Sequence, residues 1–569
     1  MDDVAAGHRS SSPPSNLTSR LLLVLVVLAA ARVIPVCCVE HVSPDAVEFL
    51  DIARNMRETG KPLLSVKAYY YAQTPITHYG GYERPLLPAL LLGLGSARAR
   101  SPILGAQWVS FAFSLLTAWC LILFLRKIYG CGPALAGGLL VGLAPPVLTA
   151  SLYPWSDMLS LFACVVALLI LAEFHPTHPD DAKRSGDAAS DRASLPAGET
   201  AAELMVGIAI GAAAAMRAVS LVMVVPVAVY FIAMRRSTMS RLRALVLLMI
   251  GPALFVAANA WVNVANNAPA LLLPQGFLYR VRSFDDGILH WAQRHAAPSV
   301  PAFLAANLPA VIRQVVKQTI AYAYILLFHH GWLFVWWVAA PLVAAGIWRR
   351  RLHPLAAVAL GVAALNFAVY ALSWATYDAS RFLLVTLALL LPICVGEVFQ
   401  AWGTVRLPIS LVRSVTLPHL LVGGTLVVFG LLAARESYTA LRADQARIRF
   451  RPYGETGVWN DPALPELCGW LNKNLGRGDA AVASPFPWTV NYLSARPCSF
   501  WPADLDTADK LAEYLEAYPV AAVVFDPRTR AADVSLPLLR RDPEWRESAV
   551  GRLLVFTRLG NSRGVQTNP

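Results

Sequence analysis

The acidic side chain of Asp45 lies near the start of the first long polar segment, just after the first apolar run. The preceding Ser43-Pro44 pair predicts a helix start, because a serine hydroxyl can cap free N–H groups and proline has no N–H to leave unpaired. Helical spacing places Asp45 beside Phe49 and Ile52, on the apolar side. A carboxylate at a membrane surface or in a closed cleft could take a proton from a hydroxyl group. Spacing alone leaves open that Asp45 only stabilises the helix N-terminus.

The other side of the same predicted helix is polar. Helical spacing gathers four residues there, which we expect to face water: Glu48, Asp51, Asn55 and Glu58. The helix is therefore expected to bury one side and to solvate the other.

The composition of the chain indicates what must position such a helix. Of its 569 residues 56% are hydrophobic and only 15% are charged, with a mean hydropathy of +0.51, which excludes an ordinary soluble globular protein. The formal charge of +12 would suggest nucleic-acid binding in a soluble chain. Here much of the excess lysine and arginine lies in short loops between apolar runs, which is typical of cytoplasmic loops in membrane proteins. Nucleic-acid binding is therefore not expected.

The apolar runs predict an α-helical polytopic membrane protein with about eleven transmembrane helices. We expect a cytoplasmic tail at 1–20, a transmembrane domain at 21–434 with outer loops at 40–101 and 263–318, and an extracytoplasmic α/β domain at 435–569. Every short basic loop falls on one side, which predicts a cytoplasmic N-terminus. Residues 202–231 form two short runs joined near Arg217, each too short to cross a bilayer fully.

The C-terminal domain shows its own mixed pattern. Helices are expected at 464–475 and 509–517, and strands at 480–484, 520–525 and 552–556. It contains no glycine-rich phosphate loop and no nucleophile elbow, so a structural or recognition role is expected. Whether Cys468 and Cys498 form a disulfide is left open.

The order of several motifs resembles the GT-C superfamily of membrane glycosyltransferases, in the branch of protein O-mannosyltransferases and aminoarabinose transferases. Asp45, Phe49 and Ala53 match the spacing of that branch's first outer loop, with Ala46 in place of a usual acidic neighbour and Phe49 in place of tyrosine. Further similar segments lie at 84–88, 152–157, 216–217, 377–382, 466–471 and 492–497.

The resemblance implies an inverting hexosyl- or pentosyltransferase of a bacterial cytoplasmic membrane. It would move a sugar from a polyprenyl-phosphate carrier to a glycan, lipid or protein acceptor on the outer face, with Asp45 as general base. Arg84, Arg217 and Arg381 would bind the donor phosphate, or else extend toward lipid headgroups. Asp157 would be a second acid that positions the acceptor, or would only favour its helix start. No metal ligands are assigned, and a divalent metal remains open.

Two other functions were weighed. A transporter or flippase for a lipid-linked or glycan substrate would carry ionisable residues near the bilayer midplane, often in repeated halves, but no repeat is found and the runs are almost free of acids. A non-catalytic assembly subunit is the third possibility. The charged residues of the second outer loop would gate the carrier or bind the acceptor, or else form a solvated loop, which is the favoured interpretation: Arg280, Arg282, Asp285, Asp286 and His290.

Overall fold

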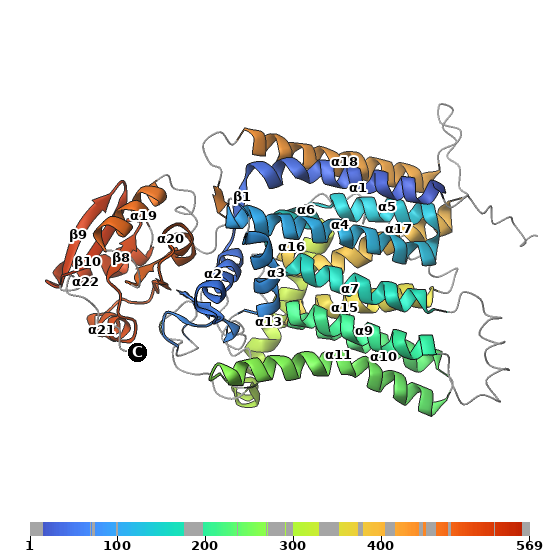
Figure 1. Ribbon diagram of the computed structural model, residues 1–569, viewed down its shortest axis with the longest axis horizontal. Helices are drawn as coiled ribbons and strands as arrows, with labels where there is room; N and C mark the ends of the chain where they lie inside the picture. Colours follow the sequence, from blue (N-terminus) through green and yellow to red (C-terminus); the bar gives the residue numbers. More distant parts are fainter. Residues whose placement is uncertain are drawn as a thin grey trace, which may run out of the picture.

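A bundle of long helices carries a smaller sheet domain at one end (Figure 1). The computed structural model of the chain describes residues 15–68, 70, 74–82, 84–97, 99, 101–175, 197–235, 237–268, 270, 291, 300–328, 352–373, 379–403, 416–442, 448–450, 463–475, 480–528 and 530–559.

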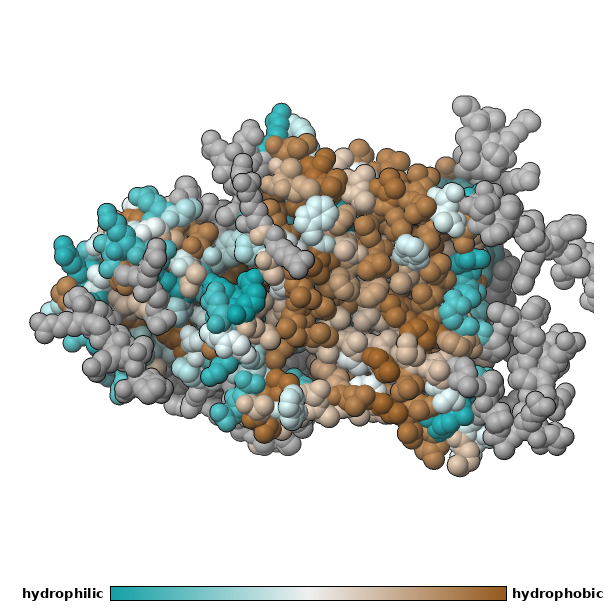
Figure 2. All heavy atoms as spheres, in the orientation of Figure 1, coloured by the Kyte–Doolittle hydropathy of each residue, from teal (hydrophilic) through white to brown (hydrophobic). Residues whose placement is uncertain are grey.

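Eight of the described helices are long and apolar enough to cross a membrane. They are α1 (Ser15–Cys38), α4 (Pro102–Tyr129), α7 (Ser156–Glu173), α9 (Ala197–Met216), α11 (Thr238–Ala265), α15 (Pro354–Ser373), α17 (Leu384–Trp402) and α18 (Leu417–Leu441). On the face shown in Figure 2, hydrophobic residues form a broad belt across this bundle, with hydrophilic residues at its far end and over the sheet domain. The chain is therefore a multi-pass integral membrane protein. The expectation of about eleven spans included a run at 319–348, most of which lies outside the described residues.

The expected span at 134–152 is broken rather than straight. It consists of α5 (Cys131–Leu143) and α6 (Pro145–Leu152), which meet at an angle of 58°. Pro145 and Pro146 cause the break, because proline has no N–H to donate and displaces the residue before it from helical geometry. Arg32, buried in α1, donates hydrogen bonds to the carbonyl oxygen of Gly142 and to the Ser151 hydroxyl, so its charged side chain ties the two halves together.

The hairpin at 202–231 is also longer than expected on one side. Its first half, α9, begins at Ala197 and provides an 18-residue apolar stretch, so the prediction that both halves are too short is wrong for this half. The chain then turns at Arg217 into a 3-10 segment, η2 (Ala218–Met223), and returns as α10 (Val224–Met234). Gly207 and Gly251 let α9 and α11 meet backbone to backbone, since a Cβ on Gly251 would lie 1.9 Å from the Gly207 oxygen.

Part of the segment expected to be the second outer loop, 263–318, is a helix that the sequence did not predict. Helix α13 (Val300–Phe328) begins 19 residues before the expected span, which starts at 319. Its apolar residues recur every fourth position and are more than half exposed, which favours contact with lipid: Leu308, Ile312, Val316, Ile320 and Tyr324. The polar residues between them conceal this periodicity. In Figure 1, α13 lies near the sheet domain and runs across the direction of the long helices.

The sheet domain contains six strands in the order β3-β7-β6-β8-β10-β9. They are β3 (Val66–Lys67), β6 (Val482–Ser484), β7 (Cys498–Phe500), β8 (Ala522–Phe525), β9 (Trp545–Val550) and β10 (Leu553–Arg558), accompanied by α19 (Ala463–Asn474), α20 (Pro487–Ser494), α21 (Ala508–Ala517) and α22 (Arg530–Arg541). The expected helices α19 and α21 and the expected strands β6, β8 and β10 are all present. The sequence did not predict β7, β9, α20 and α22.

The sheet domain is built partly from the first outer loop. Strand β3 of that loop pairs in parallel with β7, with Val66 opposite Cys498. A second parallel pair joins β1 (Glu40–Val42) to β5 (Ile448–Phe450). These pairings hold the sheet domain against α2 (Pro44–Thr59), and α20 lies next to α2 in Figure 1.

Candidate active site

Helix α2 begins as the sequence predicts. The Ser43 hydroxyl accepts a hydrogen bond from the Ala46 N–H at 3.2 Å, and Pro44 occupies the first helical position. The helix ends at Gly60, whose φ of 72° is left-handed. Asp45 therefore lies in the first turn, at the end of the bundle that faces the sheet domain.

The five predicted site residues meet at this end of the bundle, although they come from distant parts of the chain. Asp45 belongs to α2, Arg84 precedes α3 (Leu86–Ser96), and Asp157 lies in the first turn of α7. Arg217 follows α9, and Arg381 belongs to the short helix α16 (Ala379–Phe382). Together they form what we call the arginine–carboxylate chain: Arg84, Asp45, Arg381, Asp157 and Arg217.

Each acid in the arginine–carboxylate chain has two arginine partners. Asp45 pairs through Oδ1 with Arg84 Nη2 at 2.7 Å and through Oδ2 with Arg381 Nη2. Asp157 pairs through Oδ2 with Arg381 Nε at 2.8 Å and through Oδ1 with Arg217 Nη1. Arg381 therefore joins the two acids through a single edge of its guanidinium group.

Aromatic rings hold two of the arginines in place. The Cζ atom of Arg381 lies 4.4 Å from the centre of the Trp155 ring, and Trp155 Nε1 donates to the Ser43 hydroxyl at 2.7 Å. Arg217 Nε donates to the Tyr370 hydroxyl at 2.5 Å, and Tyr370 stacks on Phe382. The sequence motif at 152–157 contained Trp155 but did not indicate this contact, and nothing in the sequence pointed to Tyr370.

The arginine–carboxylate chain is partly open to the surroundings. The Asp45 side chain is 14% exposed, whereas Asp157 is 3% exposed. Burial alone would raise the pKa of Asp45, but the guanidinium groups of Arg381 and Arg84 outweigh burial and hold that pKa well below its usual range. Asp45 is thus ionised at neutral pH, and it can act as a base only when an arginine is drawn away from it.

The side of α2 expected to face water is largely covered, which corrects the prediction for Glu48 and Asp51. Glu48 is fully buried and accepts hydrogen bonds from Arg84 Nε and, at 2.6 Å, from Trp488 Nε1. Asp51 is buried against Arg54 and the Ser65 N–H. The sheet domain and the first outer loop supply this cover. Asn55 is half-buried, and Glu58 is exposed as predicted.

The described residues do not fit a divalent metal. No three histidine, cysteine, aspartate or glutamate side chains of the described part of the chain are grouped so as to hold an ion. Asp45 and Asp157 are already paired with Arg381, and Ala46 stands where the resemblance expects a further acid. These two carboxylates alone would offer a metal few of the oxygen ligands that it needs.

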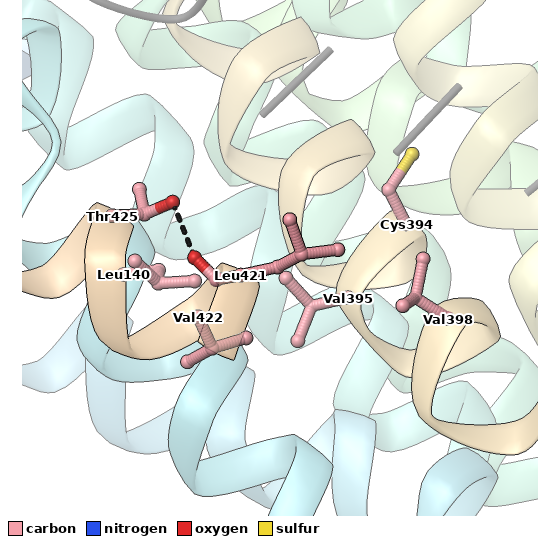
Figure 3. Close-up of a pocket in the computed structure, with 7 residues that line it drawn as sticks. All are labelled: Leu140, Cys394, Val395, Val398, Leu421, Val422 and Thr425. Carbon is pink, nitrogen blue, oxygen red and sulfur yellow. Dashed lines mark hydrogen bonds between the residues drawn. The ribbon is translucent and has the colours of Figure 1, made fainter. Parts of the chain in front are cut away.

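An apolar pocket lies between α5, α17 and α18, away from the arginine–carboxylate chain (Figure 3). Its volume is about 20 Å³, room for little more than one water-sized group. Its lining includes Leu140, Val395 and Val422, and its one hydroxyl, on Thr425, is already bonded to the Leu421 carbonyl oxygen. The pocket is too small and too apolar to bind a sugar phosphate.

Two further groups of residues noted in the sequence have different outcomes. The segment with Arg280, Arg282, Asp285, Asp286 and His290, like Tyr377 and Asp378, lies outside the described residues. Cys468 and Cys498 are buried free thiols, so they form no disulfide with each other here. Burial raises the pKa of Cys468 to about 12.

Comparison with solved structures identifies the architecture, although no protein-family model and no curated protein matches the chain. The archaeal oligosaccharyltransferase AglB from Archaeoglobus fulgidus, solved with an inhibitory peptide and a dolichol-phosphate, matches with a TM-score of 0.54 and 15% identity. The match covers 97% of this chain and 75% of that one. The chain has the GT-C fold. The apo form of the Archaeoglobus fulgidus oligosaccharyltransferase matches at a TM-score of 0.55 and 14% identity, over 90% of this chain and 69% of the other.

A mycobacterial arabinofuranosyltransferase, AftD, matches at a TM-score of 0.44 and 13% identity, over 96% of this chain and 40% of that one. Within the GT-C fold of this chain, the arginine–carboxylate chain lies where the helical bundle meets the sheet domain.

Proposed function

We propose that the chain is an inverting membrane glycosyltransferase that moves a sugar from a polyprenyl-phosphate carrier to a hydroxyl acceptor. The GT-C fold supports a lipid-linked donor, because AglB, which shares this fold, is solved with a dolichol-phosphate. The observation that carries the proposal is the arginine–carboxylate chain, in which Arg381 is shared by Asp45 and Asp157.

The three arginines suit the phosphate of such a donor. A phosphate offers oxygens that match the planar guanidinium group, and a leaving phosphate gains negative charge as its bond to the sugar breaks. Arg84, Arg217 and Arg381 are held by acids and aromatic rings, so they need little reorganisation to receive it. The hydrophobic belt of the bundle would accommodate the prenyl tail (Figure 2).

Donor binding would also prepare the base. When a phosphate draws Arg381 or Arg84 toward itself, Asp45 loses a positive neighbour and its pKa rises. The acceptor oxygen then attacks the anomeric carbon as the bond from that carbon to the phosphate oxygen breaks. The acceptor proton passes to Asp45, and the electron pair of the broken bond remains on the phosphate. Attack from the face opposite the phosphate inverts the anomeric centre.

Asp157 would hold the two arginines apart. It contacts Arg381 and Arg217 from the first turn of α7, and its near-complete burial suits a fixed anion better than an acceptor contact. We therefore propose that Asp157 keeps these guanidinium groups spaced for the phosphate. The burial of Asp157 favours this role over acceptor binding.

A direct test uses the full-length protein in lipid nanodiscs. Radiolabelled undecaprenyl-phosphate hexoses and pentoses are offered one at a time with a membrane and glycan extract, and labelled product is separated from donor. The proposal expects label transfer with at least one donor, accompanied by release of undecaprenyl phosphate. In proteoliposomes, movement of intact donor across the bilayer without any transfer would instead identify a flippase and would overturn the proposal.

A further inference from the structure

The sheet domain supplies a polar contact to the edge of the arginine–carboxylate chain. Trp488, at the start of α20, is fully buried and directs Nε1 at Oε1 of Glu48 at a distance of 2.6 Å. Glu48 in turn accepts from Arg84 Nε through its other oxygen, Oε2. Trp488, 440 positions from Glu48 in the sequence, is therefore linked to Asp45 by three successive contacts, through Glu48 and Arg84.

The contacts of Arg84 are divided in an unusual way. Its Nε atom faces Glu48, and its Nη2 atom faces Asp45. These two nitrogens form one edge of the guanidinium group, which commonly binds both oxygens of a single carboxylate. The sheet domain contains such a pair, in which Arg540 Nε and Nη2 each lie 2.8 Å from one oxygen of Glu547.

Trp488 accounts for the difference between the two pairs. Its indole Nε1 donates to Glu48 Oε1, the oxygen that a bidentate pair with Arg84 would also use. Because Glu48 is fully buried, the loss of the indole N–H would remove a donor from a buried carboxylate, which is costly in a protein interior. Arg84 Nη2 belongs to the same guanidinium edge as the Nε that already contacts Glu48, and it could move to this oxygen only by leaving Asp45.

We propose that Trp488 and Glu48 are positioning residues, which keep the Nη2 end of Arg84 directed at Asp45 and at the donor phosphate. The inference rests on the proposed function for what Arg84 binds. It makes the sheet domain a part of the donor site, in addition to any recognition role. When Trp488 is lost, Arg84 turns onto Glu48 and the site loses one of its three cations.

The test measures the affinity of undecaprenyl phosphate for the full-length protein in nanodiscs. Trp488→Phe removes the indole N–H and keeps an aromatic ring in place. Trp501→Phe is the matched control, since Trp501 is also fully buried in the sheet domain and donates Nε1 to a neutral partner, the Ser535 hydroxyl, at 3.1 Å. We expect about tenfold weaker binding for W488F, the loss of one charge-assisted contact, and less than about twofold change for W501F.

A second substitution separates positioning from a general loss of folding. In the W488F background, Glu48→Gln weakens the attraction that pulls Arg84 away from Asp45, so binding should return to within about twofold of the wild type. A purely structural role of Trp488 would make the double variant worse than the single one, and that result would overturn the inference. Equal affinities for the wild type, W488F and W501F would also overturn it, while the proposed function would stand. If none of these proteins bound undecaprenyl phosphate, the proposed donor class would be wrong and the inference would fail with it.

Discussion

Arg381 and Asp157 lie with Nε of the arginine 2.8 Å from Oδ2 of the acid, while Nη2 of the same arginine faces Asp45. One guanidinium edge is thus divided between two carboxylates from different helices. Neither acid satisfies Arg381 alone, so a phosphate that enters can compete for it. This arrangement makes Arg381 the centre of the proposed donor site.

The first prediction concerns this shared edge. Arg381→Lys keeps the charge but replaces the planar edge with a single ammonium group, which cannot hold both acids and a phosphate in the same geometry. We expect undecaprenyl phosphate to bind about tenfold more weakly, the loss of one charge-assisted contact. Titration in nanodiscs measures this affinity. Arg442→Lys is the control, because Arg442 stacks on Tyr438 outside the site. Equal affinity of R381K and the wild type would argue against a phosphate site at Arg381.

A second prediction follows from the ionisation of Asp45. Burial opposes its charge, but Arg381 and Arg84 outweigh burial, so its pKa in the folded protein lies below that of the unfolded chain. The stability that ionised Asp45 contributes is therefore complete above an unfolded pKa of about 4 and is lost as pH falls toward the folded value.

The measurement compares the thermal unfolding midpoints of the wild type and Asp45→Asn in detergent. The asparagine variant cannot ionise at position 45. We expect the wild type to be the more stable protein by a constant amount above about pH 5, and this difference to shrink as pH is lowered to about 3. A difference that stays constant over the whole range would show that the arginines do not lower the pKa of Asp45.

The third prediction tests the packing that positions α9 and therefore Arg217. Gly251→Ala places a Cβ against the backbone of Gly207, and the two helices must separate to admit it. We expect the free energy of unfolding to fall by about 2 kcal/mol, a typical cost of overpacking. Gly430→Ala in α18 is the control, since a Cβ there meets nothing within 4 Å. An equal effect of the two substitutions on thermal stability would exclude a special role for this contact.

The fourth prediction concerns the buried charge in α1. Arg32→Ala removes the donors to Gly142 and Ser151 at the break between α5 and α6. The loss of this donor to a buried carbonyl oxygen should lower the free energy of unfolding by about 2 kcal/mol. Arg20→Ala, at an exposed position of the same helix, should change it little. Thermal unfolding in detergent measures both, and an R32A protein as stable as R20A would assign Arg32 no structural role.

Local pattern predicted much of the architecture, because apolar runs and caps depend on nearby residues. The start of α2 at Ser43 is an example, and it placed Asp45 in the first turn. The basic loops predicted which side of the membrane each segment faces. This orientation placed Asp157, Arg217 and Arg381 at the same end of the bundle, where the structure brings them together. Their roles in binding and catalysis remain predictions.

Contacts between distant segments could not be predicted in this way. Glu48 was expected to face water because helical spacing says nothing about a covering surface supplied by Trp488. Strand β3 pairs with β7, which lies more than 400 residues later in the sequence, and no local pattern predicts such a pairing. The exposed apolar stripe of α13 was missed because Arg313 and Lys317 interrupt its apolar pattern.

Transfer rates of an Asp45 variant show whether Asp45 takes the acceptor proton. With the donor that supports transfer, initial rates are compared in nanodiscs for the wild type, Asp45→Asn and Glu58→Gln, an exposed carboxylate on the same helix. We expect D45N to lose transfer by at least about a hundredfold, the loss of a general base, while it still binds undecaprenyl phosphate and E58Q transfers normally. Transfer by D45N at the wild-type rate would contradict this role.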